Sequence, residues 1–227
     1  MPSLTQLLTS HERLLVLDAA SMNVQAGLLR AGFPGAWRMS EEEAGTSIFT
    51  NTEALLNEAE LQIGDIDAFI FCEGPGSMLG TRTIAMALRT WQVLSPRPAY
   101  SYQSLAVAGH YAWAQSSPRE FTVIADARRD TWHCQPVAAD GRMPPLQRRP
   151  VTALPAGEMV TPEKFRAWAT IPRPAATCSY DLARIFPVIV EGDYFQRRES
   201  PDVFQHAAPE YKQWSAQIHS TLTADKK

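Results

Sequence analysis

The residues with the clearest chemical potential form one glycine-rich stretch, Gly74-Pro75-Gly76-Ser77-Met78-Leu79-Gly80-Thr81-Arg82. It follows an apolar run and precedes a helical pattern, so unpaired backbone amides at the helix start could receive an anion. The stretch lacks the lysine of a G-x-x-x-x-G-K-[ST] phosphate loop and the G-x-G-x-x-G spacing of a dinucleotide fingerprint. A tight turn in which Ser77 caps the helix is the simpler interpretation.

Two aspartates stand at the ends of apolar runs that resemble each other. Asp18 closes Leu15-Val16-Leu17 and is followed by Ala19-Ala20-Ser21, whereas Asp126 closes Val123-Ile124-Ala125 and is followed by Ala127-Arg128. The echo suggests a duplicated unit, although an apolar strand followed by aspartate is common enough to arise alone. Neither turn after these aspartates contains a glycine, so a left-handed backbone would be costly in both. Weak or partner-dependent binding of ATP or ADP stays open.

The remaining reactive side chains do not form a catalytic or metal-binding pattern. The five histidines never stand at i, i+4, and Ser77 lacks the G-x-S-x-G context of a hydrolase nucleophile. The three cysteines lack C-x-x-C spacing, which favours a reduced, cytoplasmic protein. The arginine pairs 128–129, 148–149 and 197–198 are interpreted as solvated faces, with contact to nucleic-acid phosphate as the alternative. The sequence predicts neither a catalytic site nor a metal site.

Hydrophobic periodicity gives the elements that would position these residues. Continuous or alternating apolar runs predict strands over 14–18, 23–30, 36–39, 66–72 and 99–102, and helical spacing predicts helices over 48–61, 80–94 and 104–115. A second start follows, with strands over 121–127 and 131–137, a short helix over 163–169 and an edge strand over 185–190. Eleven of the 17 prolines lie between positions 136 and 209, which predicts a smaller, loop-rich second lobe.

Three segments follow from this pattern: a first lobe over 13–115, a second over 120–208, and a C-terminal segment over 209–227 that packs back on the first lobe and frays at its end.

Composition narrows the class of protein. The chain has 227 residues, of which 45% are hydrophobic and 20% charged, so it can bury a core and is not a disordered chain. Its net charge of −3 argues against a dedicated nucleic-acid binder. No apolar run is long enough to span a membrane, and the first residues lack the apolar core of a signal peptide. A globular cytoplasmic protein is expected.

The glycine-rich stretch resembles the GPGSFTGLR signature of the TsaB (YeaZ) family, whose members support threonylcarbamoyl-adenosine modification of bacterial tRNA. Three further stretches are similar to that family: Leu14 to Ser21, Ile124 to Arg128, and Pro209-Glu210-Tyr211. The likeness is weak between positions 143 and 205. Met78-Leu79 replaces the signature's Phe-Thr, and Ala19-Ala20-Ser21 replaces Thr-Ser/Ala-Thr, so the chain resembles a divergent member.

The resemblance implies an α/β fold of the actin-like ATPase class (ASKHA, ribonuclease H-like), with two lobes of mixed sheet flanked by helices and the second lobe reduced. It implies a non-enzymatic scaffold that binds the TsaD transferase, with the TsaE ATPase joining and tRNA reached only through the complex; metal, cofactor and membrane are not expected. Family-signature positions are Asp18, Gly74, Pro75, Gly76, Ser77, Gly80, Arg82, Asp126 and Arg128. The residues expected to pack against TsaD are Ile48, Leu55, Leu56, Met78, Ile84, Leu88 and Trp91.

The second predicted helix also carries Ala85, Met86 and Val93 off its main apolar face, where a partner could cover them. Two other functions remain open. One is an actin-fold, ATP-dependent phosphotransferase that would use Asp18 or Asp126, and the other is a homodimeric, chaperone-like scaffold unrelated to tRNA.

Overall fold

The first lobe is organised by a strand that is apolar on both faces. A computed structural model describes residues 1–116, 119–171 and 173–205. In it, β1 (Arg13–Asp18) points Leu14 and Val16 into one core and Leu15 and Leu17 into another, as the two-residue period of a strand requires. It lies inside a six-stranded sheet of order β11-β5-β4-β1-β2-β3. The other strands are β2 (Val24–Arg30), β3 (Ala36–Ser40), β4 (Ala68–Gly74), β5 (Ala99–Gln103) and β11 (Gln196–Arg198).

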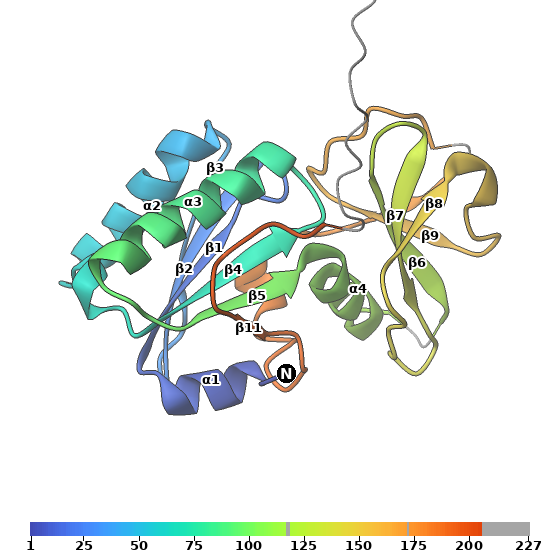
Figure 1. The fold of residues 1–227 in the computed structure, drawn as a ribbon. Coiled ribbons are helices and arrows are strands. Elements are labelled where there is room, and N and C mark those ends of the chain that lie inside the picture. Colours follow the sequence, from blue (N-terminus) through green and yellow to red (C-terminus); the bar gives the residue numbers. More distant parts are fainter. Residues whose placement is uncertain (117–118, 172, 206–227) are drawn as a thin grey trace, which may run out of the picture.

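Helices cover both faces of this sheet (Figure 1). The core around Leu15 and Leu17 is closed by α2 (Ala44–Glu58) and α3 (Met78–Leu94). The core around Leu14 and Val16 is closed by α1 (Leu4–Ser10), α4 (Ser104–Ala114) and α5 (Leu182–Ile185). A 3₁₀ turn, η1 (Ile63–Asp65), connects α2 to β4. The capping box that starts α1, Ser3 with Gln6, is visible in the sequence although that helix was not predicted.

The second lobe repeats the strand order of the first. Its sheet runs β10-β9-β6-β7-β8, and each pair has the same direction as its counterpart in β5-β4-β1-β2-β3. The duplicated unit that the two aspartates suggest is thus confirmed: five strands in each lobe share the same order and the same directions. The strands are β6 (Phe121–Asp126), β7 (Thr131–Val137), β8 (Gln147–Pro150), β9 (Met159–Pro162) and β10 (Ala176–Cys178).

The second lobe is reduced on one side. Leu105 of α4 packs on one face of its sheet, and the same helix contributes Val107 and Ala108 to the first lobe, so α4 lies between the two sheets (Figure 1). The other face is covered by loops and the 3₁₀ turn η2 (Val151–Ala153), whose apolar side chains pack on Trp132 and Met159.

Two predicted elements of the second lobe are wrong. Residues 163–169 form turns instead of a helix, because Lys164 adopts a left-handed φ of 62° directly after Pro162 and Glu163. Residues 185–190 are not a strand: Ile185 ends α5 and Ile189 lies in the turn that follows, both buried. The apolar side chains there recur at four-residue spacing, which is the helical period.

The chain also returns to the first lobe earlier than expected. Tyr180, α5 and Phe195 belong to a first-lobe core, and β11 pairs antiparallel with β5 at the edge of the first sheet. The second lobe therefore ends before Tyr180 instead of at position 208, because the buried aromatic side chains of this segment complete the core below β1. The predicted packing of 209–227 lies outside the described residues.

Candidate functional site

The glycine-rich stretch forms the turn between β4 and α3. Ser77 caps the helix as predicted, with its hydroxyl accepting a hydrogen bond from the Gly80 amide at 3.3 Å. The Thr81 hydroxyl donates to the Ser77 carbonyl at 3.0 Å, which adds a second bond across the first helical turn. The side chains of Ser77 and Thr81 therefore bond to backbone within the turn.

This turn lies in direct contact with the turn that follows β1. The Ser77 amide donates to the Ala20 carbonyl at 2.7 Å. A Cβ built on Gly76 would lie 2.3 Å from that same oxygen, and one built on Gly80 would lie 2.2 Å from the Ala19 carbonyl oxygen. Real Cβ atoms do not approach backbone oxygens so closely, so both glycines are required by packing. Two of the amides at this helix start, those of Ser77 and Gly80, are thus bonded within the protein.

Asp18 is fully buried beneath these turns. Its carboxylate accepts hydrogen bonds from the hydroxyls of Tyr102 at 2.6 Å and Tyr180 at 2.7 Å, and from the Ala20 amide at 2.8 Å. Burial raises the pKa of Asp18, although these hydrogen bonds act in the opposite direction. A carboxylate enclosed in this way links β1, β5 and the returning segment, and it does not face a position where a metal–nucleotide complex could lie.

Asp126, its counterpart in the second lobe, is bonded to backbone. Its carboxylate accepts from the amides of Arg128, Trp168 and Ala169. Partial burial opposes ionisation, but the amide hydrogen bonds prevail and lower the pKa of Asp126. The Arg128 guanidinium lies over the Trp168 ring, 5.4 Å from its centroid. Asp126 therefore fixes a loop against the end of β6.

A cleft of about 670 Å³ separates the two aspartate turns. On one side are the turn after β1, residues 41–45, and the glycine-rich turn. On the other are Asp126, Arg128, Phe165, Arg166 and Trp168. Most of the signature positions thus gather around one cleft. Its polar groups include acids at 41–43 and two arginines, and these do not form a paired nucleophile and base.

Most of the predicted partner-binding residues lie in the core. Ile48, Leu55, Leu56, Ile84 and Leu88 are buried against the sheet, so they support the helices from inside and are not available to a partner. They recur at the spacing of the face that a helix presents to its own sheet. Met78 is exposed, and Trp91 is half-buried between the rings of Phe49 and Phe69.

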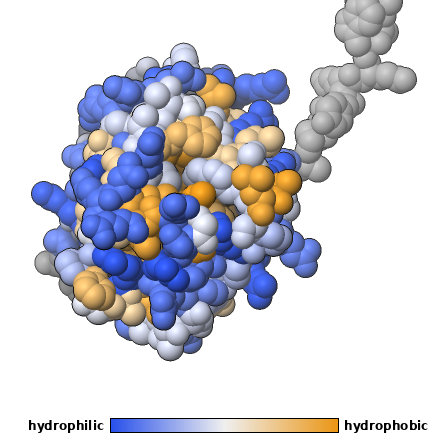
Figure 2. Space-filling view, turned by 90° about the vertical axis from the view of Figure 1, so that its left-hand side faces the viewer, coloured by the Kyte–Doolittle hydropathy of each residue, from blue (hydrophilic) through white to orange (hydrophobic). Residues whose placement is uncertain are grey.

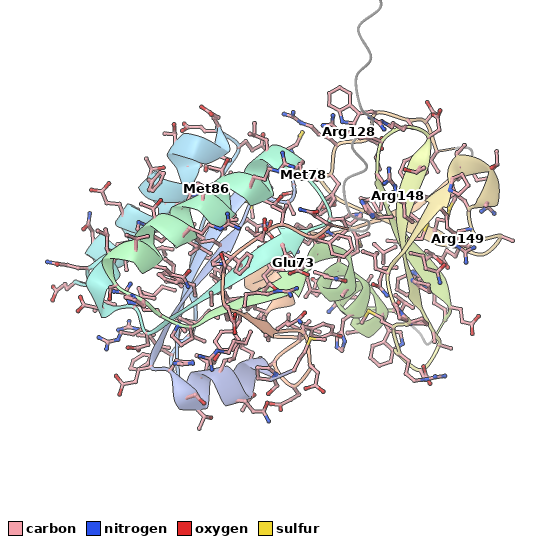
Figure 3. The ribbon with its side chains drawn as sticks, viewed as in Figure 1. Glu73, Met78, Met86, Arg128, Arg148 and Arg149 are labelled. Atoms are coloured by element: carbon pink, nitrogen blue, oxygen red, sulfur yellow. The ribbon has the colours of Figure 1, made fainter. Side chains whose placement is uncertain are left out.

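The outward face of α3 carries a different apolar set, which we call the α3 stripe: Leu79, Met86 and Val93. They are 72%, 57% and 83% exposed and stand seven residues apart, so they lie along one side of the helix. Met86 and Val93 were singled out from the sequence; Ala85 is buried instead. Figure 3 shows Met78 at the end of α3 nearest the second lobe and Met86 further along the helix.

Phe49 of α2, which is 48% exposed, borders a separate groove of about 300 Å³. The groove is lined by α2, the residues around η1, and Trp91 of α3. Figure 2, which looks at the side of the molecule where α2 and α3 lie, shows hydrophobic side chains reaching the surface between hydrophilic ones.

Within residues 1–116, 119–171 and 173–205, no group of three His, Cys, Asp or Glu side chains could hold a metal ion. In the same ranges no helix has the length and apolar character needed to cross a membrane.

Comparison with known proteins identifies the fold. No family model matches the sequence, and no curated protein matches it. Among solved structures, YeaZ from Pseudomonas aeruginosa aligns with a TM-score of 0.60 and 19% identity, covering 79% of this chain and 90% of that one. The chain has the YeaZ fold. A second structure, of an uncharacterised protein with similarity to peptidase YeaZ from the same organism, gives a TM-score of 0.60 and 18% identity over 78% of this chain and 89% of that one.

The predicted fold class is confirmed in its architecture: two lobes of mixed sheet with flanking helices, and a reduced second lobe, as in the YeaZ structures. The signature was therefore a correct guide to the fold of YeaZ even where neighbouring residues diverge. Because the identity is low, the likeness extends to architecture and leaves function to be argued from the surfaces of this chain.

Proposed function

We propose that the chain is a non-catalytic scaffold subunit that binds and supports a TsaD-type threonylcarbamoyl transferase in tRNA modification. The observation that carries this proposal is the α3 stripe. Leu79, Met86 and Val93 repeat at the heptad spacing with which one helix packs on another, and they are exposed in the single chain. Exposed apolar side chains aligned in this way favour an interface with a partner helix.

The hydrogen bonds around the cleft favour a scaffold function over a catalytic one. Asp18 is enclosed by two tyrosines, Asp126 is bonded to three amides, and the Ser77 amide is bonded to Ala20. These are the groups that a phosphotransferase with this fold would need for a metal or phosphate. The phosphotransferase alternative would require these bonds to break when substrate binds.

The groove between α2, η1 and α3 would give a partner a second apolar contact, apart from the stripe. Phe49 and Trp91, with ring centroids 5.9 Å apart, border it together with Leu56. An apolar side chain from a partner helix would bury against these rings, and buried aromatic anchors of this kind contribute most of the binding free energy in interfaces. A TsaE-type ATPase and tRNA would join through the transferase, and the whole assembly would be cytoplasmic.

The test is light scattering after size exclusion, with this chain alone and mixed with the TsaD protein of the same organism. A 1:1 heterodimer is expected at concentrations of about ten micromolar, and Met86→Glu or Val93→Glu should abolish it. Phe33→Glu is the matched control, because Phe33 is 64% exposed on the same lobe but lies in the turn between β2 and β3. Circular dichroism melts show whether each variant is folded.

The outcomes separate the candidate functions. A heterodimer that survives both substitutions would refute the stripe as the interface. A homodimer that persists in the presence of TsaD, and that Met86→Glu dissociates, would favour the homodimeric scaffold unrelated to tRNA. Absence of any assembly would refute the scaffold proposal, and ATP titration would then test the phosphotransferase.

A further inference from the structure

The second lobe carries a charge opposite to that of the rest of the chain. Residues 121–180 contain eight arginines and lysines against five aspartates and glutamates, although the whole chain has a net charge of −3. Two of those cations are neutralised by acids: Arg142 pairs with Asp140 at 2.7 Å and Lys164 with Glu41 at 2.7 Å. The other six cations could bind a negatively charged ligand.

Arg128 and Arg129 lie in the turn between β6 and β7, in a conformation that arginine rarely adopts. The φ angles of Arg128, Arg129 and Asp130 are 64°, 51° and 54°, so three consecutive residues without glycine are left-handed. The left-handed region is unfavourable for residues with a Cβ, and glycine or asparagine would form this turn at less cost. Both arginine side chains of the turn are exposed.

A third arginine reaches the same turn from the edge strand β8. Arg148 donates from Nε to the Thr131 hydroxyl at 2.9 Å and from Nη2 to the Ala127 carbonyl at 3.1 Å. Both acceptors are neutral, so they hold the guanidinium in place without cancelling its charge. In the part of the chain that the structure describes, no carboxylate lies within ion-pair distance of these three guanidinium groups.

Acids near the turn limit its positive charge. Asp126 interacts electrostatically with Arg128, but its oxygens accept backbone amides of Arg128, Trp168 and Ala169 and are therefore already engaged. Asp130 belongs to the turn itself and is exposed. Residues 41–43, all glutamates, line the cleft together with Arg128 and Trp168, and one of them, Glu41, pairs with Lys164. Arg129 and Arg148 do not line this cleft, so the positive charge of the turn is concentrated on the side away from those glutamates.

Trp168 adds an aromatic surface beside the arginines. Its side chain is 70% exposed, and the Arg128 guanidinium covers one side of the ring at 5.4 Å from the centroid. The backbone is fixed, because the Trp168 and Ala169 amides donate to Asp126 at 2.5 and 2.8 Å. A tryptophan that is held in place, and that leaves most of its ring in water, is a platform on which a planar group can stack.

We propose that the β6–β7 turn, with Arg148 and Trp168, binds single-stranded nucleic acid. The arginines would contact successive phosphates, and Trp168 would stack on a base next to them. An acidic protein segment would satisfy the arginines but would leave the exposed indole unused. Duplex binding is less favoured, because paired bases are already stacked on each other and a short turn cannot read them by stacking.

This inference goes beyond the proposed function and does not depend on it. The α3 stripe lies on the first lobe, whereas the turn belongs to the second lobe, and Figure 3 shows Arg128 and Arg148 on that lobe. A protein that fails to bind TsaD can still bind RNA, and the reverse also holds. The experiment therefore uses this chain alone.

The neighbouring residue in β8 provides a matched control. Arg149 follows Arg148, so its side chain points to the opposite face of the sheet, where it donates to the Gln147 side chain at 2.7 Å. Figure 3 shows Arg149 further from the turn than Arg148. Arg148→Gln and Arg149→Gln remove the same charge from adjacent positions of one strand, and only the first should affect binding.

The measurement is fluorescence anisotropy of a labelled twelve-nucleotide oligouridine RNA at low salt. Arg128→Gln and Arg148→Gln should each weaken binding several-fold and reduce the salt slope by about 0.7, as expected for one lost phosphate contact on a single strand. Trp168→Ala should weaken it by about tenfold or more, while Trp168→Phe, which keeps a stacking face, should retain most of the affinity. Arg149→Gln should bind as the unmodified chain does. Circular dichroism melts establish that each variant is folded.

Four results would overturn the proposal. The first is absence of binding to the RNA at low salt. The second is an equal loss of affinity in Arg148→Gln and Arg149→Gln, which would show that only overall charge matters. The third is binding of a polyglutamate peptide as tight as that of RNA, which would indicate an acidic protein partner. The fourth is displacement of the RNA by millimolar ATP, which would indicate a mononucleotide site in the cleft.

Discussion

Replacing Gly80 with alanine is the most direct test of how the two turns fit together. Gly80 lies in the first turn of α3, and an added Cβ would lie 2.2 Å from the Ala19 carbonyl oxygen and 2.9 Å from the Ala19 Cβ. Neither atom is the flexible end of a side chain, so relief requires α3 to move away from the turn after β1. Such movement would lengthen the 2.7 Å hydrogen bond from the Ser77 amide to Ala20.

Two effects of opposite sign determine the size of the change. Alanine is favoured over glycine within helices by about 1 kcal/mol, whereas overpacking of a close contact costs about 1–3 kcal/mol and sometimes more. Loss of the Ser77 hydrogen bond would add about 1 kcal/mol. We therefore expect Gly80→Ala to lower the free energy of unfolding by about 1–3 kcal/mol, and the midpoint of thermal unfolding by several degrees for a chain of this size.

Gly45→Ala is the matched control. Gly45 also lies in the first turn of a helix, α2, but a Cβ there would meet only the end of the Glu43 side chain, at 3.3 Å. This variant should be as stable as the unmodified chain or slightly more stable. The assay is urea unfolding followed by circular dichroism, with the midpoints compared at constant m-value. If Gly80→Ala were as stable as Gly45→Ala, the glycine would not be required by packing.

The remaining predictions concern buried or bonded charges. Because burial raises the pKa of Asp18 in the folded chain, its contribution is full below its unfolded value and is lost as pH rises through the folded one. The stability of the unmodified chain relative to Asp18→Asn should therefore fall as the pH rises above the ordinary aspartate pKa of about 4. The pKa of Asp126 is lowered in the folded chain, so its contribution to the free energy of unfolding is present above the unfolded pKa and is lost as the pH falls. Asp126→Asn should therefore cost stability at neutral pH but not in acid. If urea unfolding showed the two aspartates changing stability with pH in the same direction, this reasoning would be contradicted. Glu73, which is 6% exposed, pairs with Arg198 at 2.5 Å. Arg198→Met should cost about 3 kcal/mol by leaving that carboxylate unpaired, and adding Glu73→Gln should recover part of the loss; a double variant that is less stable than Arg198→Met would contradict this account.

The strands and helices of the first lobe could be predicted because their patterns are strong and local. The run from Leu14 to Leu17 is apolar on both faces, as a central strand must be, and Ser77 marks the start of α3. The second lobe was harder, because its elements are short and its packing comes from loops. Lys164 in a left-handed conformation, and the helical spacing of Ile185 and Ile189, decide local structure there, and neither produces a long periodic signal.

The site was only partly predictable, for a different reason. Helical spacing identifies an apolar face but does not say whether a sheet or a partner covers it, and Ile84 and Leu88 proved to face the sheet. The hydrogen bonds that enclose Asp18 come from Tyr102 and Tyr180, which are 84 and 162 residues away in the chain. Contacts at such separation leave no trace in a single sequence.

One of the two departures from the TsaB-like signature, Met78-Leu79, falls where the structure leaves side chains exposed, whereas the other, Ala19-Ala20-Ser21, is buried. Gly76 and Gly80, which match the signature, are fixed by contact with the backbone of Ala20 and Ala19. Met78 and Leu79, which replace Phe-Thr, are 43% and 72% exposed, and Leu79 begins the α3 stripe. Packing therefore constrains the two glycines, whereas the residues between them are free to change together with whatever binds α3. If the proposed scaffold function holds, the α3 stripe is the place where a distinct partner preference would reside.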